Sequence, residues 1–487
     1  MRGRNLFVRK PIDAGADDTQ SEAGEKQGLK RHLGSVQLTS IGIGAIIGAG
    51  IFVLTGQAAA FYAGPGVLFS FMIAAIVCVF AGLCYAELAS FIPASGGSYS
   101  YAYAALGELP AWIIGWSTLI QYLASACTVA IGWSSYFASL LKDFNIYLPE
   151  MFIRAPLVYG PDMGWQWSGA FFNVPAVAII VLLGIMISLG LKAATTLNNV
   201  MVVVKLSVIV LFVVFGAFYV VPGNWFPIIP ENTGVFGEFG WSGVLRGAGL
   251  VFFAYNGFDT VATLAQDSKN PQKTIPIGML GSLAVSTFAY ILMVLVLTGV
   301  VSYTTLGVAD PISVVLNAMG PKFIWFGFVV KFAILAALTS VVLAVLIAQT
   351  RVFFTMSRDG LIPARVAKIH PRTHTPVFAT WIIVALAVVI AGFLPADMLG
   401  QLVSLAVLTA FVLMCLGVLI LRYTHPNVHR PFKVPFMPYI PLLAIAACLG
   451  QTLFLPLTIW VQFFVWTLLG LCIYFTFGVK HSKMRGK

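Results

Sequence analysis

Charged side chains are scarce in this sequence. Of its 487 residues, 9% are Asp, Glu, Lys or Arg, whereas 59% are apolar. An average soluble domain is about 25% charged and roughly 45–50% apolar. A chain of this length and composition cannot bury its apolar surface within one water-soluble core. The composition therefore excludes a soluble protein, a disordered protein and a disulfide-held scaffold, and it leaves a membrane protein that crosses the bilayer many times.

Cysteine and histidine are also rare, with six residues of each. The cysteines lie within apolar runs and none has a CxxC spacing, so neither a zinc site nor a disulfide framework is indicated. His425 and His429 are four residues apart, but no third ligand lies nearby in the sequence, and we expect no metal. The GxxxxGKS/T loop of ATP-binding proteins is absent, so we expect no enzymatic activity and no cofactor.

Long apolar runs make up most of the chain, and a helix needs about 20 apolar residues to cross a bilayer. The runs predict an all-α integral membrane protein with twelve transmembrane helices. They lie at residues 36–62, 65–92, 108–138, 171–191, 198–221, 243–266, 276–302, 323–350, 377–395, 398–421, 437–455 and 459–478.

The basic residues are unevenly divided between the segments that join these runs. With the N-terminus inside, the cytoplasmic segments hold 22 of the 28 Lys and Arg residues and the outer segments hold four. Under the positive-inside rule, residues 1–35 and 479–487 are therefore predicted to be cytoplasmic tails. Residues 1–35 also lack the apolar core of a signal peptide. The formal charge of +11 indicates orientation and contact with anionic lipid rather than a nucleic-acid partner.

Four charged residues lie inside the predicted spans and away from their first and last few residues: Glu87, Lys205, Asp259 and Lys331. A charge at the centre of a spanning helix costs about 2.5–3.5 kcal/mol on insertion scales. Such residues usually face a cavity or a partner, so these four are the first functional candidates.

The first span is rich in glycine, with four glycines among residues 42–50. Each glycine costs about 1 kcal/mol relative to alanine inside a helix. Gly44 and Gly48 form a GxxxG pair, which is one device for close helix packing. The alternative is an unwound break at mid-membrane, whose free N–H groups would bind a carboxylate. This run alone favours neither interpretation.

The sixth span is interrupted near its middle by Asn256, Gly257 and Asp259. One interpretation is an intact helix in which Asp259 makes a local hydrogen bond. However, paired breaks at matching positions of two halves are typical of inverted-repeat transporters, and the interruption lies five spans after the first. The polar interruption in the sixth span therefore favours a break in both the first and the sixth spans.

Six segments resemble the amino acid–polyamine–organocation superfamily, most of all its cationic amino acid transporter family and the related bacterial permeases. The resemblance runs from about residue 30 to 482. The segments are GIGAIIGAGIF in the first span, CYAEL (84–88), PASGGSYSYAY (93–103), FFAYNGFDT (252–260), NPQKTIPIG (270–278) and QTRVFFTMSRDGLIP (349–363).

The resemblance implies a five-plus-five inverted repeat, formed by residues 36–221 and 243–421 and followed by two further helices in 437–478. It also implies that the α-carboxylate of a substrate binds backbone N–H groups around Ile46, Gly48, Ala49 and Gly50. The α-amino group would meet unpaired carbonyls at Phe253, Ala254 and Asn256. Phe253 would cover the substrate, and Asp259 would lie near the amino group or hold the break open.

Lys205 matches a family lysine that is thought to replace a sodium ion beside the first break. A lysine in such a low-dielectric site can gain and lose a proton during transport. The alternative is that Lys205 extends to the cytoplasmic surface. Glu87 would help to close an inner gate or pair with a cytoplasmic cation, and we prefer the second, structural interpretation.

Three residues depart from the cationic members of the family. Gln121 stands where they carry a glutamate, Ala49 where threonine is common, and Lys331 where a small residue is usual. Losing a carboxylate and gaining an ammonium group would both weaken a site for arginine or lysine, because like charges repel strongly in a low-dielectric cavity. We therefore hypothesise a preference for neutral amino acids, provided that Gln121 and Lys331 face the cavity.

The predicted function is a secondary active amino acid transporter that works by alternating access and is coupled to protons. It would lie in a bacterial plasma membrane, in contact with lipid and without an obligatory protein partner. An amino acid exchanger remains an alternative, and an amino acid sensor is a less favoured one.

Overall fold

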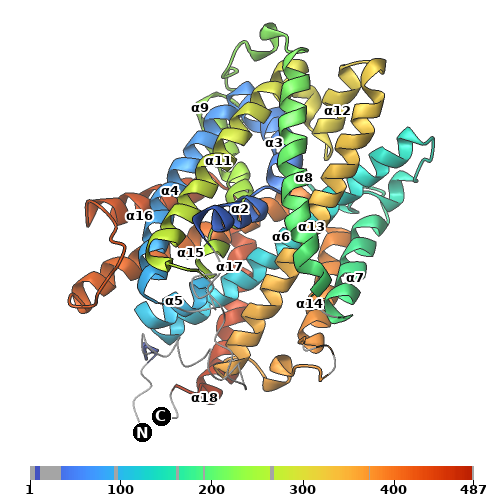
Figure 1. The fold of residues 1–487 in the computed structure, drawn as a ribbon. Coiled ribbons are helices and arrows are strands. Elements are labelled where there is room, and N and C mark those ends of the chain that lie inside the picture. The colour runs from blue at the N-terminus through green and yellow to red at the C-terminus, as the bar shows by residue number, and fades with distance from the viewer. Residues whose placement is uncertain are drawn as a thin grey trace.

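The structure is a computed structural model, and it describes residues 6–10, 34–92, 97–160, 164–189, 192–263, 268–371, 373 and 375–484. Most of the predicted N-terminal tail and residues 485–487 lie outside this part. The described chain is a bundle of helices (Figure 1). Each apolar run predicted from the sequence contains at least one helix among its described residues.

The helices of the first half are α2 (Ser35–Ile46), η1 (Gly50–Leu54), α3 (Thr55–Ala58), η2 (Ala59–Ala63), α4 (Val67–Phe91), α5 (Gly97–Ala105), α6 (Glu108–Asp143), α7 (Val174–Leu189) and α8 (Lys192–Ala217). Those of the second half are α9 (Gly240–Val251), η6 (Phe252–Tyr255), α10 (Thr260–Thr263), α11 (Pro271–Val300), α12 (Pro311–Ala318), α13 (Ile324–Arg358), α14 (Val377–Phe393), α15 (Ala396–Thr424), α16 (Tyr439–Leu453), α17 (Leu457–Ile473), η10 (Tyr474–Gly478) and α18 (Val479–His481). Short 3₁₀ turns lie at Gly64–Gly66, Glu150–Phe152, Pro222–Trp225, Tyr303–Leu306, Pro321–Phe323 and Ala364–Ala367.

Within the described residues, six helical stretches are long and apolar enough to cross a membrane. Five shorter apolar helices accompany them, including α2, the first half of the broken first span. The six stretches are Gly50–Phe91, Glu108–Asp143, Gln272–Val300, Pro321–Arg358, Ala396–Thr424 and Leu457–His481.

The first span is broken, as the glycine run allows. α2 ends at Ile46, and Ile47 has an extended backbone with φ −74° and ψ 106°. The helix begins again at Gly50 as the π-helical turn η1, and continues through α3 and η2. In Figure 1, α2 lies against α11 and α8.

The sixth span is broken at its polar residues. After α9, the chain tightens into the 3₁₀ turn η6 and then leaves the helix at Asn256, with φ −61° and ψ 130°. Gly257 has φ +113°, in the left-handed region that glycine adopts at no steric cost. Helix resumes at Thr260. An intact sixth helix, the alternative considered above, is therefore wrong.

Four elements arise in segments that hydropathy treats as connections. α5 and α12 are too short and too polar to predict as spans. β1 (Leu157–Gly160) and β2 (Gly164–Trp167) form an antiparallel hairpin that pairs Leu157 with Trp167. α6 and α13 also continue past their predicted ends at 138 and 350, because a helix can extend beyond the apolar core of the bilayer while its side chains become polar.

Residues 6–10 and the last described residues meet at one end of the bundle. The Lys10 ammonium lies 3.4 Å from an Asp359 carboxylate oxygen, and the Lys483 N–H donates to the Asp359 carbonyl at 3.1 Å. Asp359 follows α13 directly, so both segments lie where that helix ends.

Candidate functional site

The two breaks lie against each other and enclose a pocket together with α6 and α13. η1 packs against η6 at this point. The centre of a water-sized sphere can move through about 70 Å³ of the pocket. Since one buried water needs roughly 10–15 Å³ on this measure, the space suits a solute of several non-hydrogen atoms. The lining residues are Gly44, Ala45, Ile46, Gly48, Ala49, Gly50, Tyr122, Ser125, Val129, Phe253, Asn256, Gly257, Thr260, Val341, Ala344, Val345 and Ala348.

No residue in this lining set is Asp, Glu, Lys, Arg or His. The polar groups come from the two broken backbones and from a few neutral side chains, among them Ser125 and Asn256. The α13 side of the pocket is apolar, with two valines and two alanines. Small-molecule sites commonly combine an apolar wall with a few placed polar groups.

The first break presents the start of a helix to the pocket. The first N–H groups of a helix have no partner inside it, and they attract anions. Here the helix resumes at Gly50, and Ile46, Gly48, Ala49 and Gly50 all line the pocket. The four residues predicted for carboxylate binding therefore all line the same pocket.

Glycine is required where the two breaks touch. A Cβ added to Gly50 would overlap the Cα of Ala254, so the backbones approach closely only without a side chain there. A Cβ on Gly257 would lie 2.8 Å from the Ala45 carbonyl oxygen. The glycines of both runs therefore bring the two breaks into contact.

The second break differs from the prediction in two respects: Ala254 is not in the lining set, and two carbonyls predicted to be unpaired have partners. Its carbonyls at Phe253 and Ala254 have partners. The Phe253 carbonyl accepts the N–H of Asn256 at 3.0 Å, and the Ala254 carbonyl accepts the Tyr290 hydroxyl at 2.8 Å. A carbonyl oxygen has two lone pairs, so each retains capacity for a further donor. Phe253 lines the pocket and is 5% exposed.

Tyr290, on α11, connects the two breaks. Its hydroxyl oxygen lies 3.1 Å from the Ile46 carbonyl oxygen and 2.8 Å from that of Ala254. The residue is fully buried. Sequence reasoning missed it, because one tyrosine in the apolar run 276–302 has no spacing that distinguishes it from a packing residue.

Lys205 is buried beside the first break. Its ammonium group donates to the Gly44 carbonyl at 2.9 Å, and the residue is 1% exposed. It therefore does not extend to the cytoplasmic surface, which excludes the alternative raised from the sequence. Gly44 lines the pocket and Lys205 does not, so Lys205 contacts the lining through its hydrogen bond to Gly44.

Gln121 lies beside the second break rather than in the lining set. Its side-chain amide donates to the Asn256 side-chain oxygen at 2.7 Å, and the Asn256 amide donates to Ser125 at 3.3 Å. Asn256 and Ser125 both line the pocket. The glutamine thus orients a pocket residue through an uncharged network.

Asp259 is outside the lining set, although its neighbours Gly257 and Thr260 are in it. Its carbonyl accepts the N–H of Ala262 at 3.0 Å, which begins the turn of α10. This position fits the second of its two predicted roles, holding the break open, better than contact with the substrate.

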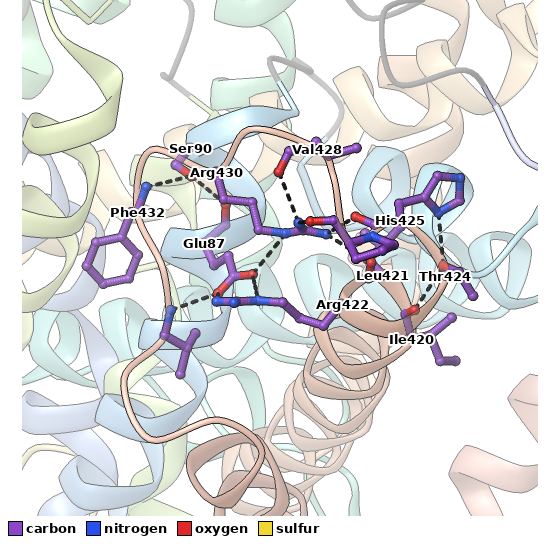
Figure 2. Close-up of polar contacts among 12 residues, drawn as sticks. Glu87, Ser90, Ile420, Leu421, Arg422, Thr424, His425, Val428, Arg430 and Phe432 are labelled. Carbon is purple, nitrogen blue, oxygen red and sulfur yellow. Dashed lines mark hydrogen bonds and ion pairs between the residues drawn. The ribbon is translucent and has the colours of Figure 1, made fainter.

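Glu87 binds cationic partners away from the pocket (Figure 2). Its carboxylate accepts two hydrogen bonds from Arg422, both at 2.7 Å, and one from the Val434 N–H at 2.7 Å. The Arg430 Nε lies 3.4 Å from Glu87 Oε1. Glu87 is 1% exposed, so this network joins α4 to the end of α15 and the segment that follows.

Lys331 does not face the pocket, so the hypothesis that its charge acts there is wrong. Its ammonium group donates to both carboxylate oxygens of Asp143, at 2.9 and 2.7 Å. On α13 the pocket begins at Val341, ten residues and about 15 Å of helix rise further along. The sequence alone did not reveal Asp143 as the partner.

These features define the class of protein. Long apolar helices with a small-molecule pocket between two broken ones are the arrangement of a multi-pass membrane transporter. The family model for amino acid permeases matches residues 33–478, and the chain therefore belongs to the amino acid permease family.

Three relatives agree with this assignment. The chain is 41% identical over 478 residues to a methylthioribose transporter of Bacillus subtilis (strain 168), covering 98% of this chain and 99% of the relative. It is 42% identical over 485 residues to the branched-chain amino acid permease BcaP of the same strain, covering 99% and 100%. It is 34% identical over 408 residues to the vacuolar cationic amino acid transporter 4 of Arabidopsis thaliana, covering 82% of this chain and 64% of that protein. The resemblance seen in the sequence is confirmed.

Proposed function

We propose that this protein takes up neutral L-amino acids by proton-coupled secondary transport across a bacterial cell membrane. The observation that carries the proposal is the pocket itself. It lies where two helix breaks meet, and its lining set has no charged side chain. Backbone groups there match the two charged ends of an amino acid, and the rest of the wall is neutral.

The substrate would bind across the two breaks. Its carboxylate would accept N–H groups at Gly48, Ala49 and Gly50, with Ile46 beside them. Its ammonium group would donate to the carbonyls of Phe253, Ala254 and Asn256. The side chain would then point toward the valines and alanines of α13. No cofactor is needed, because binding and release are the only chemistry.

Neutral selectivity follows from what faces the pocket. An arginine or lysine side chain would have to leave water without a carboxylate to pair with, which is costly in a low-dielectric site. Gln121, which stands where cationic family members carry a glutamate, is not in the lining set and would act only through its hydrogen bond to Asn256, so the preference rests on the lining residues themselves. A relative named for branched-chain amino acids supports the same preference.

A second candidate substrate comes from the relative named for methylthioribose. This thio-sugar is neutral and small, but it has neither a carboxylate nor an ammonium group. The helix-start N–H groups at the first break would then meet hydroxyl oxygens rather than an anion. A direct comparison of the two ligands therefore tests the role of the breaks.

We further propose twelve membrane spans in a five-plus-five inverted repeat, with both termini cytoplasmic. The breaks in the first and sixth spans support the repeat, and the excess of basic residues in the inner segments supports the orientation. Rocking of the broken spans and their neighbours against the rest would alternately open the outer and inner paths.

Coupling would depend on Lys205. The charged ammonium group would stabilise the first break through Gly44, and loss of the proton would remove the positive charge and weaken that hydrogen bond. Each inward positive charge gains about 2.3 kcal/mol per 100 mV. This is enough to accumulate substrate roughly fortyfold, since ~1.4 kcal/mol is a factor of ten. If the proton does not cross, the same pocket would support amino acid exchange.

The test is uptake by proteoliposomes under an inward proton gradient. Labelled leucine and labelled lysine are each offered alone and with an excess of unlabelled isoleucine, arginine or methylthioribose. We expect leucine uptake that collapses with a protonophore and is competed by isoleucine. Strong lysine uptake competed only by arginine would overturn the neutral preference, and uptake that survives the protonophore but needs internal amino acid would establish exchange.

A further inference from the structure

The chain between α15 and α16, residues 425–438, is held in one path by a buried guanidinium group (Figure 2). Arg430 is 5% exposed and donates to the carbonyls of Leu421 and His425, both at 2.9 Å. A third hydrogen bond, at 3.0 Å, goes to the Val428 carbonyl. These carbonyls belong to the end of α15 and the turn that follows it. We call residues 425–438 the α15–α16 connection.

The α15–α16 connection is also fastened to α4 through its backbone. The Phe432 N–H donates to the Ser90 hydroxyl at 3.4 Å, and the Val434 N–H donates to the Glu87 carboxylate at 2.7 Å. Lys433 lies between these two anchored residues, and it is exposed. Its ammonium group is therefore presented to the outside by a backbone that is already fixed.

Positive charge exceeds negative charge around the connection. One carboxylate, Glu87, accepts two hydrogen bonds from Arg422 and lies 3.4 Å from the Nε of Arg430. Lys433 adds a third cation, and the exposed Arg9 adds a fourth because it donates to a hydroxyl at the end of α15 at 3.5 Å. The sequence contains no Asp or Glu beyond residue 397. This surface therefore attracts an anion.

α16 continues from the connection and presents an apolar stripe to the outside of the bundle. It is one of the shorter apolar helices of the described residues. Positions three or four apart share one face of a helix, and the exposed large side chains on this face are Tyr439, Leu442, Leu443, Leu449 and Leu453. In a helix that crosses the bilayer, such a face meets lipid.

Two exposed tyrosines mark the level of the membrane surface beside the connection. Tyr423 lies in the last turn of α15 and Tyr439 begins α16, so they flank the connection on both sides. Tyrosine is enriched where the hydrocarbon core of a bilayer meets water. The cations of the connection therefore lie at the depth of phospholipid headgroups.

We propose that the α15–α16 connection and the stripe of α16 form a docking surface for an anionic phospholipid. The phosphate would meet Lys433, Arg9 and the partly exposed Arg422, and the acyl chains would lie along α16. Because the basic surface continues directly into a lipid-facing one, a phospholipid fits it better than a soluble anion. The connection is ordered by Arg430 beforehand, so binding does not have to order it. The inference does not depend on which solute the protein carries.

The experiment measures lipid binding rather than transport. Purified full-length protein in neutral detergent is titrated with phosphatidylglycerol or with phosphatidylcholine of the same acyl chains, and bound lipid is followed by native mass spectrometry. The test variant combines Arg9→Gln and Lys433→Gln. The matched control combines Arg365→Gln and Lys368→Gln, which removes two exposed cations from the connection between α13 and α14. Thermal unfolding is recorded for each variant to confirm that it is folded.

The parent should bind phosphatidylglycerol about thirtyfold more tightly than phosphatidylcholine. The test variant should lose this factor for phosphatidylglycerol, since each basic residue near an anionic surface contributes about fivefold. Its affinity for phosphatidylcholine should be unchanged. The control variant should bind both lipids with parental affinity.

Three results would overturn the proposal. Parental affinity of the test variant for phosphatidylglycerol would remove Arg9 and Lys433 from the site. Equal losses in the test and control variants would show that positive charge acts without a defined site. Displacement of bound phosphatidylglycerol by soluble glycerol phosphate would identify a site for a phosphate group alone. Failure of leucine uptake would overturn only the proposed substrate, because lipid binding is measured without transport.

Discussion

Replacement of Gly50 by alanine tests the contact between the two breaks. The added methyl group would overlap the Cα of Ala254, which is backbone and cannot rotate away. Two other substitutions serve as references. Gly48→Ala places a methyl group 3.3 Å from a Val341 side-chain carbon, and Gly327→Ala meets nothing within 4 Å.

The size of the effect follows from the nature of the obstacle. Overpacking a well-packed site costs about 1–3 kcal/mol, and a backbone obstacle belongs at the upper end of that range. Since ~1.4 kcal/mol is a factor of ten, separation of the breaks by Gly50→Ala should weaken leucine binding roughly a hundredfold. Gly48→Ala should cost less than about tenfold because Val341 can change rotamer. Gly327→Ala should have no effect.

The assay is equilibrium binding of labelled leucine to purified protein, with thermal unfolding recorded for each variant. All three variants make the same chemical change, and the thermal unfolding temperature separates an effect on folding from an effect on leucine binding. A folded Gly50→Ala protein that binds leucine with parental affinity would refute the close approach of the breaks. Equal losses in Gly48→Ala and Gly50→Ala would show that the methyl group acts only by narrowing the pocket.

Three further substitutions separate the roles assigned to buried polar residues. Lys205→Ala should abolish accumulation driven by a pH gradient while amino acid exchange survives, and unchanged pH-driven accumulation in vesicles would make Lys205 structural. Tyr290→Phe should weaken leucine binding about tenfold, since it removes a hydroxyl hydrogen bond worth roughly 0.5–1.5 kcal/mol and leaves buried carbonyls without that donor. Parental affinity in that variant would remove Tyr290 from the site. Glu87→Gln should lower the thermal unfolding temperature far more than it changes leucine binding, because it leaves the Arg422 charge without its carboxylate, and the reverse outcome would assign Glu87 to the substrate path.

The helix breaks were predictable because their causes are local. Glycines at 42–50 and the polar residues Asn256 and Asp259 conflict with an apolar helix wherever they occur. The structure resolves the choice left open at the first span, since Ile47 is extended and the helix restarts at Gly50. Most of the residues predicted to contact a substrate through their backbone do line the pocket.

Side-chain partners across the bundle were not predictable in the same way. The depth of Lys331 was counted along its own helix, but its partner Asp143 lies 188 positions away in the sequence. Tyr290 and Ile46 are likewise distant in the chain, and only packing of α11 against α2 brings them together. The sequence of one helix allowed the Lys205 side chain to be either buried or at the surface. It is buried because its ammonium group donates to the Gly44 carbonyl of the first break.

The central claim is that the two breaks hold both charged ends of an amino acid. The most direct test compares the thermal unfolding temperature of the purified protein with leucine, leucinamide, N-acetylleucine and lysine at equal concentration. We predict stabilisation by leucine alone, because leucinamide lacks the carboxylate, N-acetylleucine lacks the ammonium group and lysine carries a second charge. Equal stabilisation by leucine and by either blocked derivative would contradict the claim.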